Sequence, residues 1–196
     1  MKQSNTKENI IETGTRILLQ KGYNDAGLQE ILKAAGVPKG SFYHFFKSKQ
    51  AFGAEVLAVY AAEFEKVLQK HLSDIHVPPL VRLHNFFLAM IEQFEQTQEC
   101  KGGCLVGNMA QELADSNEEF RTQIQSVMRN WQDYFEACLK QAKERGDLTL
   151  DADPSDLAEV MFNGWEGAVM KMKVVNSVDP LRSYVRVMFQ MLAQPE

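Results

Sequence analysis

One short predicted helix near the N-terminus carries side chains that could read a nucleic acid. On a helical wheel with 100° per residue, its polar residues gather on one side and its phenylalanines on the other. The polar side holds Lys39, Gly40, Tyr43 and His44, and the apolar side holds Phe42, Phe45 and Phe46. Lysine, tyrosine and histidine can contact phosphate oxygens and base edges, while glycine allows the backbone to approach closely. This face therefore suits a DNA groove.

Two cysteines in the sequence ECKGGCLVGN form the other group with possible chemistry. Cys104 is predicted to begin a helix, where the helix dipole favours a thiolate, and Lys101 adds positive charge nearby. Glu99 opposes this effect, and burial would oppose it too. The pattern favours a thiol that reacts with electrophiles or oxidants, with Cys100 as a second thiol. Cys138 lies in the apolar stripe of a later predicted helix and is typical of an inert core thiol.

The same cysteines are a poor match to a metal site. Cys100 and Cys104 are four residues apart rather than in a CxxC pair, and the histidines between residues 71 and 84 lack ligand spacing. We therefore expect no metal site and no cofactor.

The element that must position the polar face is a helix-turn-helix. The preceding apolar residues recur at i, i+3, i+4 and i+7, and are Leu28, Ile31, Leu32 and Ala35. Gly36 stops that helix, and Pro38 is predicted in the first turn of the next, which spans about residues 38–46. Two short helices joined by a tight turn containing glycine predict a DNA-reading motif.

The helix that follows extends the expected DNA contact. Ser48 is predicted to be its N-cap, so Lys49 stands in its first turn, where a DNA phosphate would satisfy both the helix dipole and the ammonium. The complete set of residues expected to contact DNA is Lys39, Gly40, Ser41, Tyr43, His44 and Lys49.

The distribution of charge separates this head from the remainder of the chain. Residues 1–50 contain eight Lys or Arg against four Asp or Glu, whereas the other residues contain 13 against 22. The head is thus at +4 and the remainder at −9, as expected for a DNA-binding head on a body that avoids DNA. No run of about eighteen apolar residues and no secretory signal is visible, so we expect a cytoplasmic protein without a membrane span.

Helical periodicity continues to the end of the chain, and no strand pattern or repeat is found. We predict an all-α fold of nine helices, with a DNA-binding domain over residues 1–48 and an effector-sensing and dimerisation domain over 49–196. The fourth helix, about residues 49–72, connects them and is predicted to bury Val59, among others. Ser116 and Glu119 are predicted to form a capping box that opens the long seventh helix.

The last two predicted helices have the apolar faces of a dimer contact. In the eighth, the shared face consists of Val160, Met161, Gly164, Ala168 and Met172. The ninth is covered by Leu181, Tyr184, Val185, Met188, Phe189 and Leu192. Two copies could form a four-helix contact. The alternative is a helical hairpin that is buried within a monomer.

The chain resembles the TetR family of transcriptional repressors. The matching segments are Gly27 to Phe52 and LLQKGY at Leu18 to Tyr23. This resemblance implies three head helices followed by six body helices, and a homodimer on a palindromic double-stranded operator. It also implies DNA contacts by Lys39, Gly40, Tyr43 and Lys49. Phe45 stands where many members have a phosphate-binding histidine.

The resemblance further implies a regulatory ligand cavity in the body. The candidate lining residues are Phe86, Met90, Phe94, Met109, Trp131, Phe135, Phe162 and Trp165. The GCL tripeptide at 103–105 and the GAxxxxK run at 167–173 are similar to the branch that answers reactive electrophiles. In that branch Cys104 would be the sensor and Lys173 would lie near it. The same GCL context also occurs in members with non-covalent ligands.

Three alternatives remain open from the sequence. An enzyme or thiol carrier could use Cys104, although no Cys-His-Asn or Ser-His-Asp arrangement supports it, so we predict no catalytic residues. A repressor could respond to a purely non-covalent small molecule. A constitutive or activating DNA-binding protein is the third alternative.

Overall fold

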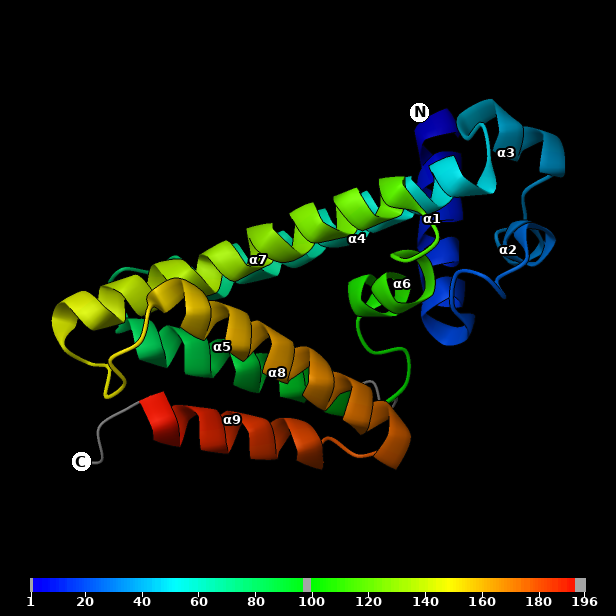
Figure 1. The fold of residues 1–196 in the computed structure, drawn as a ribbon. Coiled ribbons are helices and arrows are strands. Elements are labelled where there is room, and N and C mark those ends of the chain that lie inside the picture. The colour runs from blue at the N-terminus through cyan, green and yellow to red at the C-terminus, as the bar shows by residue number, and fades with distance from the viewer. Residues whose placement is uncertain (1, 97–99, 193–196) are drawn as a thin grey trace. The chain divides into compact units, whose positions relative to one another are not determined.

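The computed structural model describes residues 2–96 and 100–192, with side chains from residue 6 onward. The regular structure within these ranges is α-helical, as predicted, and comprises nine helices (Figure 1). They are α1 (Lys2–Lys21), α2 (Leu28–Ala34), α3 (Lys39–Phe45), α4 (Lys49–Leu72), α5 (Pro79–Gln96), α6 (Leu105–Leu113), α7 (Glu118–Arg145), α8 (Pro154–Val175) and α9 (Asp179–Leu192).

Contacts divide the chain into two compact units. The first contains the residues up to Glu63 together with Cys104–Val127, and the second contains Phe64–Gly103 together with the residues from Met128 onward. Helices α4 and α7 therefore contribute to both units. The predicted functional boundary after residue 48 is a separate matter and stays a prediction.

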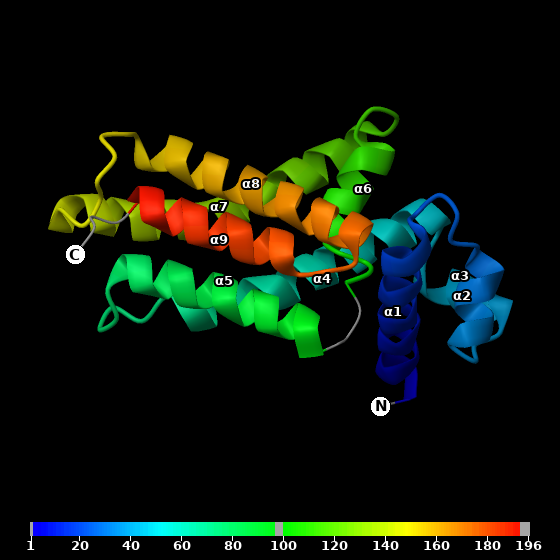
Figure 2. The same ribbon diagram turned by 90° about the horizontal axis from the view of Figure 1, so that it is seen from below.

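The first unit is built round phenylalanine rings. Phe42, Phe46 and Phe52 are buried, with ring centroids 5.1 Å apart for Phe42 and Phe46 and 5.6 Å apart for Phe42 and Phe52. Gly14 in α1 makes room for this cluster, because a Cβ there would collide with the Phe52 ring. Figures 1 and 2 show α1, α2 and α3 grouped together, and α6 packs against α1. The buried rings of Phe46 and Phe52 thus support α3 from its apolar side through their contacts with Phe42.

The second unit packs α9 against α8 and α5 (Figure 2). Small residues set how closely α8 and α9 approach. A Cβ on Gly164 would lie 2.6 Å from the Tyr184 ring, and the Tyr184 hydroxyl donates a hydrogen bond to the Met161 carbonyl. Burial raises the pKa of that hydroxyl. The hairpin of α8 and α9 is therefore tightly closed on its inner side.

The prediction that Val59 is buried in α4 is wrong, since 39% of its surface is exposed. Buried positions move round α4 along its length, from Phe52 and Val56 near its start to Leu68 and Leu72 near its end. An apolar stripe extrapolated in a straight line from Phe52 and Val56 therefore includes Val59, although the buried side of α4 has already turned away at that point.

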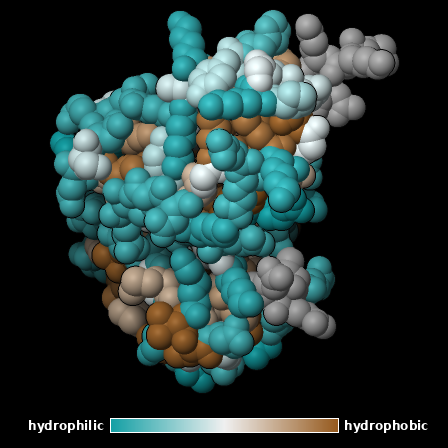
Figure 3. Space-filling view, turned by 90° about the vertical axis from the view of Figure 1, so that its right-hand side faces the viewer, coloured by the Kyte–Doolittle hydropathy of each residue, from teal (hydrophilic) through white to brown (hydrophobic). Residues whose placement is uncertain are grey.

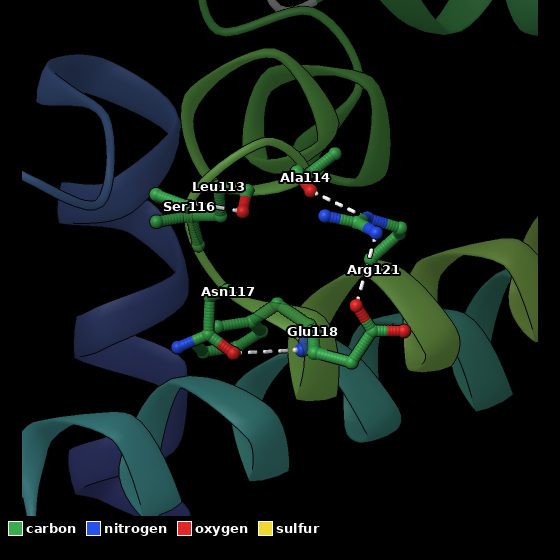
Figure 4. A network of polar contacts seen from close by, with 7 residues as sticks. Leu113, Ala114, Ser116, Asn117, Glu118 and Arg121 are labelled. Carbon is green, nitrogen blue, oxygen red and sulfur yellow. Dashed lines mark hydrogen bonds and ion pairs between the residues drawn. The ribbon is translucent and has the colours of Figure 1, made fainter.

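The start of α7 corrects another prediction (Figure 4). Asn117, not Ser116, is the N-cap: its Oδ1 accepts from the Phe120 N–H at 3.1 Å. The Ser116 hydroxyl instead donates to the Leu113 carbonyl at 3.4 Å, and the Glu119 carboxylate accepts from the Gln50 amide at 2.7 Å. Both members of the predicted capping box are thus engaged elsewhere.

Other helix ends follow the predicted signals. Asp153 caps α8 by accepting from the Ser155 N–H at 2.8 Å, and α7 ends immediately before Gly146. No helix within residues 2–96 and 100–192 is both long and apolar enough to cross a membrane.

Candidate DNA-reading head and thiol site

The turn between α2 and α3 is closed by backbone hydrogen bonds. Gly36 has φ +66°, a conformation that side-chain-bearing residues rarely adopt, and Val37 N–H donates to the Leu32 carbonyl at 3.0 Å. The Asn9 side chain donates to the Ala35 carbonyl at 2.8 Å and so holds the turn against α1. Pro38 lies at the N-cap rather than in the first turn as predicted, because its ψ of 147° is extended.

Helix α3 presents the predicted polar face to solvent. Lys39, Gly40, Tyr43 and His44 are exposed, and Ser41 is half-buried. Tyr43 exposes 54% of its surface, although its ring touches buried Phe42 with centroids 5.3 Å apart. A Cβ on Gly40 would meet no atom within 4 Å, so the protein itself leaves this position open. The polar residues are therefore supported from behind by the phenylalanine core.

Figure 3 shows the side of the molecule on which α2 and α3 lie in Figure 1. Hydrophilic side chains cover most of this side, and hydrophobic atoms form separate patches among them (Figure 3).

Lys49 is less free to move than an ordinary surface lysine. Ser48 caps its helix, as predicted, by accepting from the Ala51 N–H at 3.0 Å. The Lys49 ammonium donates to the Asn24 carbonyl at 3.2 Å and lies 4.8 Å from the centre of the Tyr23 ring. Burial lowers the pKa of Lys49, while the carboxylates of Glu112 and Asp25 act in the opposite direction. The ammonium thus has a defined position near the turn that follows α1.

Cys104 was predicted to begin α6, and it lies one residue before the first helical residue, at the N-cap. Its Sγ accepts a hydrogen bond from the Gly107 N–H at 3.5 Å. The preceding Gly103 has φ +68°, and a Cβ on it would lie 2.9 Å from Cδ of Lys173 and 3.2 Å from Cγ1 of Val169. The stem of Lys173 therefore lies against the residue before Cys104. Cys100, in the same segment, is half-buried.

Cys138 differs from the other two cysteines. It is buried, its thiol donates to the Leu72 carbonyl at 3.7 Å, and burial raises its pKa. Its surroundings agree with the prediction of an inert core thiol. None of the three cysteines forms a disulfide, and the described residues contain no group of three or more His, Cys, Asp or Glu that could hold a metal ion.

Most residues predicted to line a ligand cavity are packed together in the second unit. Phe86, Met90, Trp131, Phe135, Phe162 and Trp165 are buried, and Phe94 is half-buried. Phe87 joins this cluster: its ring centroid is 4.9 Å from that of Trp165 and 5.4 Å from that of Phe135. Met109 is buried in the first unit. Their role in ligand binding stays a prediction.

The outer face of α8 and α9 corrects the predicted dimer surface. Five of the expected residues are buried within the chain itself and cannot form its surface: Met161, Met172, Leu181, Val185 and Leu192. A helical wheel identifies the apolar residues of α8 and α9, but it does not distinguish those that pack between the two helices from those that face outward. Outside lies an open groove of about 670 Å³, lined by Gly167, Ala168, Lys171, Val175, Asp179, Pro180, Ser183, Tyr184, Val187, Met188 and Met191.

Two family models match the chain in sequence. Residues 10–56 match the model described as "Bacterial regulatory proteins, tetR family", and residues 79–188 match "Tetracyclin repressor-like, C-terminal domain". The transcriptional repressor DhaR of Mycobacterium sp. (strain GP1) is 34% identical over 192 residues, which cover 98% of this chain and 94% of DhaR. The chain belongs to the TetR family.

Other relatives place this TetR-family protein near the branch suggested by its sequence. The repressor NemR of Escherichia coli is 31% identical over 98% of the chain and 96% of NemR. The structure of reduced E. coli NemR superposes with a TM-score of 0.89, covering 97% of this chain and 98% of that one. The regulatory protein TetR from Rhodobacter sphaeroides gives a TM-score of 0.89 at 36% identity, covering 95% and 98%. The resemblance to the NemR branch is confirmed.

Proposed function

We propose that this protein is a homodimeric repressor that leaves its operator when Cys104 reacts with an electrophile or oxidant. The observation that carries the proposal is the position of Cys104, whose sulfur caps the N-terminus of α6. As relatives are named transcriptional repressors, we infer a regulator rather than an enzyme.

The DNA-binding part of the proposal is supported by the exposed face of α3. Lys39, Tyr43 and His44 offer donors to phosphates and base edges, and open Gly40 lets the helix backbone approach the groove. Two copies related by a twofold axis would place two such helices on the half-sites of a palindrome.

The dimer is proposed to form through the groove between α8 and α9, occupied by a second copy of the chain. Val187 and Met191 expose 48% and 53% of their surface there, and Gly167 and Ala168 allow another helix to approach closely. The groove also contains one lysine and one aspartate, Lys171 and Asp179, which provide complementary charges for a symmetric partner.

The sensing part of the proposal rests on the chemistry of a thiolate. A thiolate on Cys104 would accept the Gly107 N–H and interact favourably with the dipole of α6. Addition to an activated alkene would form a sulfur–carbon bond and break the alkene π bond, and solvent would protonate the adjacent carbon. The bulky adduct could no longer occupy the N-cap, so α6 would shift. The structure of E. coli NemR in a reduced form is consistent with redox-sensitive chemistry in this branch.

The test is release of operator DNA by N-ethylmaleimide, measured for wild type and for Cys104→Ser, Cys100→Ser and Lys173→Ala. We expect wild type and Cys100→Ser to release DNA and Cys104→Ser to retain it. Lys173→Ala should react more slowly if its ammonium favours the thiolate. Release from Cys104→Ser at the wild-type dose would contradict covalent sensing and point to a non-covalent ligand of the aromatic cluster.

A further inference from the structure

The carboxylate of Glu112, near the end of α6, holds the turn that follows α1. One oxygen accepts from the Tyr23 N–H at 3.1 Å and the other from the Asn24 N–H at 2.9 Å. Gly22 makes this approach possible, because a Cβ there would collide with the carboxylate. Two charge-assisted hydrogen bonds to adjacent backbone amides fix both the position and the orientation of the turn.

The same turn positions Lys49. The Asn24 N–H donates to Glu112 and the Asn24 carbonyl accepts from the Lys49 ammonium, so one residue links the carboxylate to the cation. The Tyr23 ring lies beneath the ammonium and is supported from another side by Phe120, with ring centroids 5.3 Å apart. Only one of the three N–H bonds of the ammonium is needed for the Asn24 carbonyl, which leaves two for a phosphate.

We propose that Glu112 is a positioning residue for DNA binding, acting through the Tyr23–Asn24 turn on Lys49. The inference rests on the proposed function, in which Lys49 contacts a DNA phosphate. Under this inference the negatively charged Glu112 strengthens the binding of negatively charged DNA. A carboxylate that acted only by repelling DNA would weaken binding, whereas a carboxylate that fixes Lys49 strengthens it.

The position of Glu112 also relates DNA binding to the thiol site. Cys104 caps the first turn of α6, and Glu112 is the eighth of the nine residues of that helix. A displacement of α6 caused at Cys104 would therefore move the carboxylate away from the two amides. Lys49 would then lose its fixed position at the moment when the repressor must leave DNA.

The test compares Glu112→Gln, Lys49→Ala and the double variant with wild type. Glutamine has the same size as glutamate, but it lacks one acceptor and brings an NH₂ group against the backbone N–H groups. We expect Glu112→Gln to bind operator DNA about tenfold more weakly and to flatten the dependence of log K on log salt by about one unit, as Lys49→Ala should. The double variant should bind no more weakly than Lys49→Ala alone.

Two variants serve as matched controls. Glu118→Gln removes the same charge from an exposed position in α7, and Gln111→Ala changes the exposed neighbour of Glu112 in the same helix. Both should bind DNA at least as tightly as wild type. Hydrogen exchange at the amides of Tyr23 and Asn24 should accelerate in Glu112→Gln but not in the controls. Glu112→Asp, which keeps the charge on a shorter side chain, should fall between wild type and Glu112→Gln in affinity.

The outcomes separate the inference from the function on which it rests. Equal losses from Glu112→Gln with and without Lys49 would show a general structural role and overturn the inference. So would a Glu112→Gln protein that binds like Glu118→Gln while Lys49→Ala is impaired. A normal salt slope in Lys49→Ala would remove Lys49 from the proposed phosphate contacts, and the inference would fail with it.

Discussion

Two helical faces of this protein leave a glycine open to solvent, but their surroundings differ. A Cβ on Gly40 in α3 or on Gly167 in α8 would meet no atom within 4 Å. Around Gly40 lie Lys39, Tyr43 and His44, whereas Gly167 belongs to a groove that also contains Val187 and Met191. Openness alone therefore does not indicate a partner, and the chemistry of the neighbours does.

The two faces also differ in what water does to them. The polar face of α3 is well solvated without a partner, so it needs no permanent coverage and is suited to reversible binding of DNA. Contiguous apolar side chains such as those of the α8–α9 groove favour permanent coverage by another protein surface. The comparison predicts one face that binds reversibly and another that stays covered.

The largest effect is expected from Val187→Glu, which places a carboxylate in the apolar groove. If a second copy covers this residue, an unpaired buried charge should destabilise the dimer by roughly 3–5 kcal/mol. Sedimentation velocity should then show monomers with weak operator affinity. Gln190→Glu adds the same charge at an exposed position of α9 outside the groove and should remain dimeric. A dimeric Val187→Glu protein would place the interface elsewhere.

Gly40→Ala should separate stability from function. Alanine in a helix is more favourable than glycine by about 1 kcal/mol, and its methyl group has open space here, so the melting temperature should rise. Operator affinity should nevertheless fall by about tenfold, or about 1.4 kcal/mol, because the methyl group would hold α3 away from the groove. Gly167→Ala should also stabilise the fold but weaken the dimer. A Gly40→Ala protein with normal affinity would show that α3 does not approach DNA at this residue.

The charges of the two faces should respond differently to salt. Lys39→Ala should weaken binding to all DNA sequences and reduce the salt slope by about one unit, because one phosphate contact is lost. Lys171→Ala, in the α8–α9 groove, should leave that slope unchanged when measured on dimers. Equal slopes for wild type and Lys39→Ala would exclude Lys39 from the phosphate contacts.

The smallest effect is expected from Asn117→Ala, which removes the N-cap of α7. We expect a loss of about 1 kcal/mol of unfolding free energy by chemical denaturation, and little change for Ser116→Ala. Neither substitution touches the α3 face or the groove. If Ser116→Ala were the more damaging of the two, the assignment of Asn117 as the cap would be wrong.

Sequence reasoning succeeded where the signal is local. Ser48, Asp153 and Gly146 mark helix ends through bonds or conformations within a few residues, and Cys104 lies within one residue of its predicted place at the start of α6. At Ser116 and Asn117 two good capping residues are adjacent, and the capping-box pattern predicted Ser116 although Asn117 is the cap.

Errors of another kind arose where burial depends on distant partners. Val185 and Val187 are the same residue type two positions apart in α9. Only 2% of the surface of Val185 is exposed, because it faces the interior of the hairpin, whereas Val187 exposes 48%. The role of Glu112 was missed for a similar reason. Its partners Tyr23 and Asn24 are 89 and 88 residues away, and no spacing rule connects them.

The shortness of α6 has a consequence for how easily this helix can unwind. A helix of nine residues is marginal in water, so α6 depends on burial of its apolar side chains, among them Leu105, Val106 and Met109. The hydrogen bond from the Gly107 N–H to the Cys104 sulfur adds to this burial by stabilising the first turn of the helix. Losing that bond would shift the helix–coil balance of the whole segment. A reaction at Cys104 could thus act by unwinding α6 as readily as by displacing it.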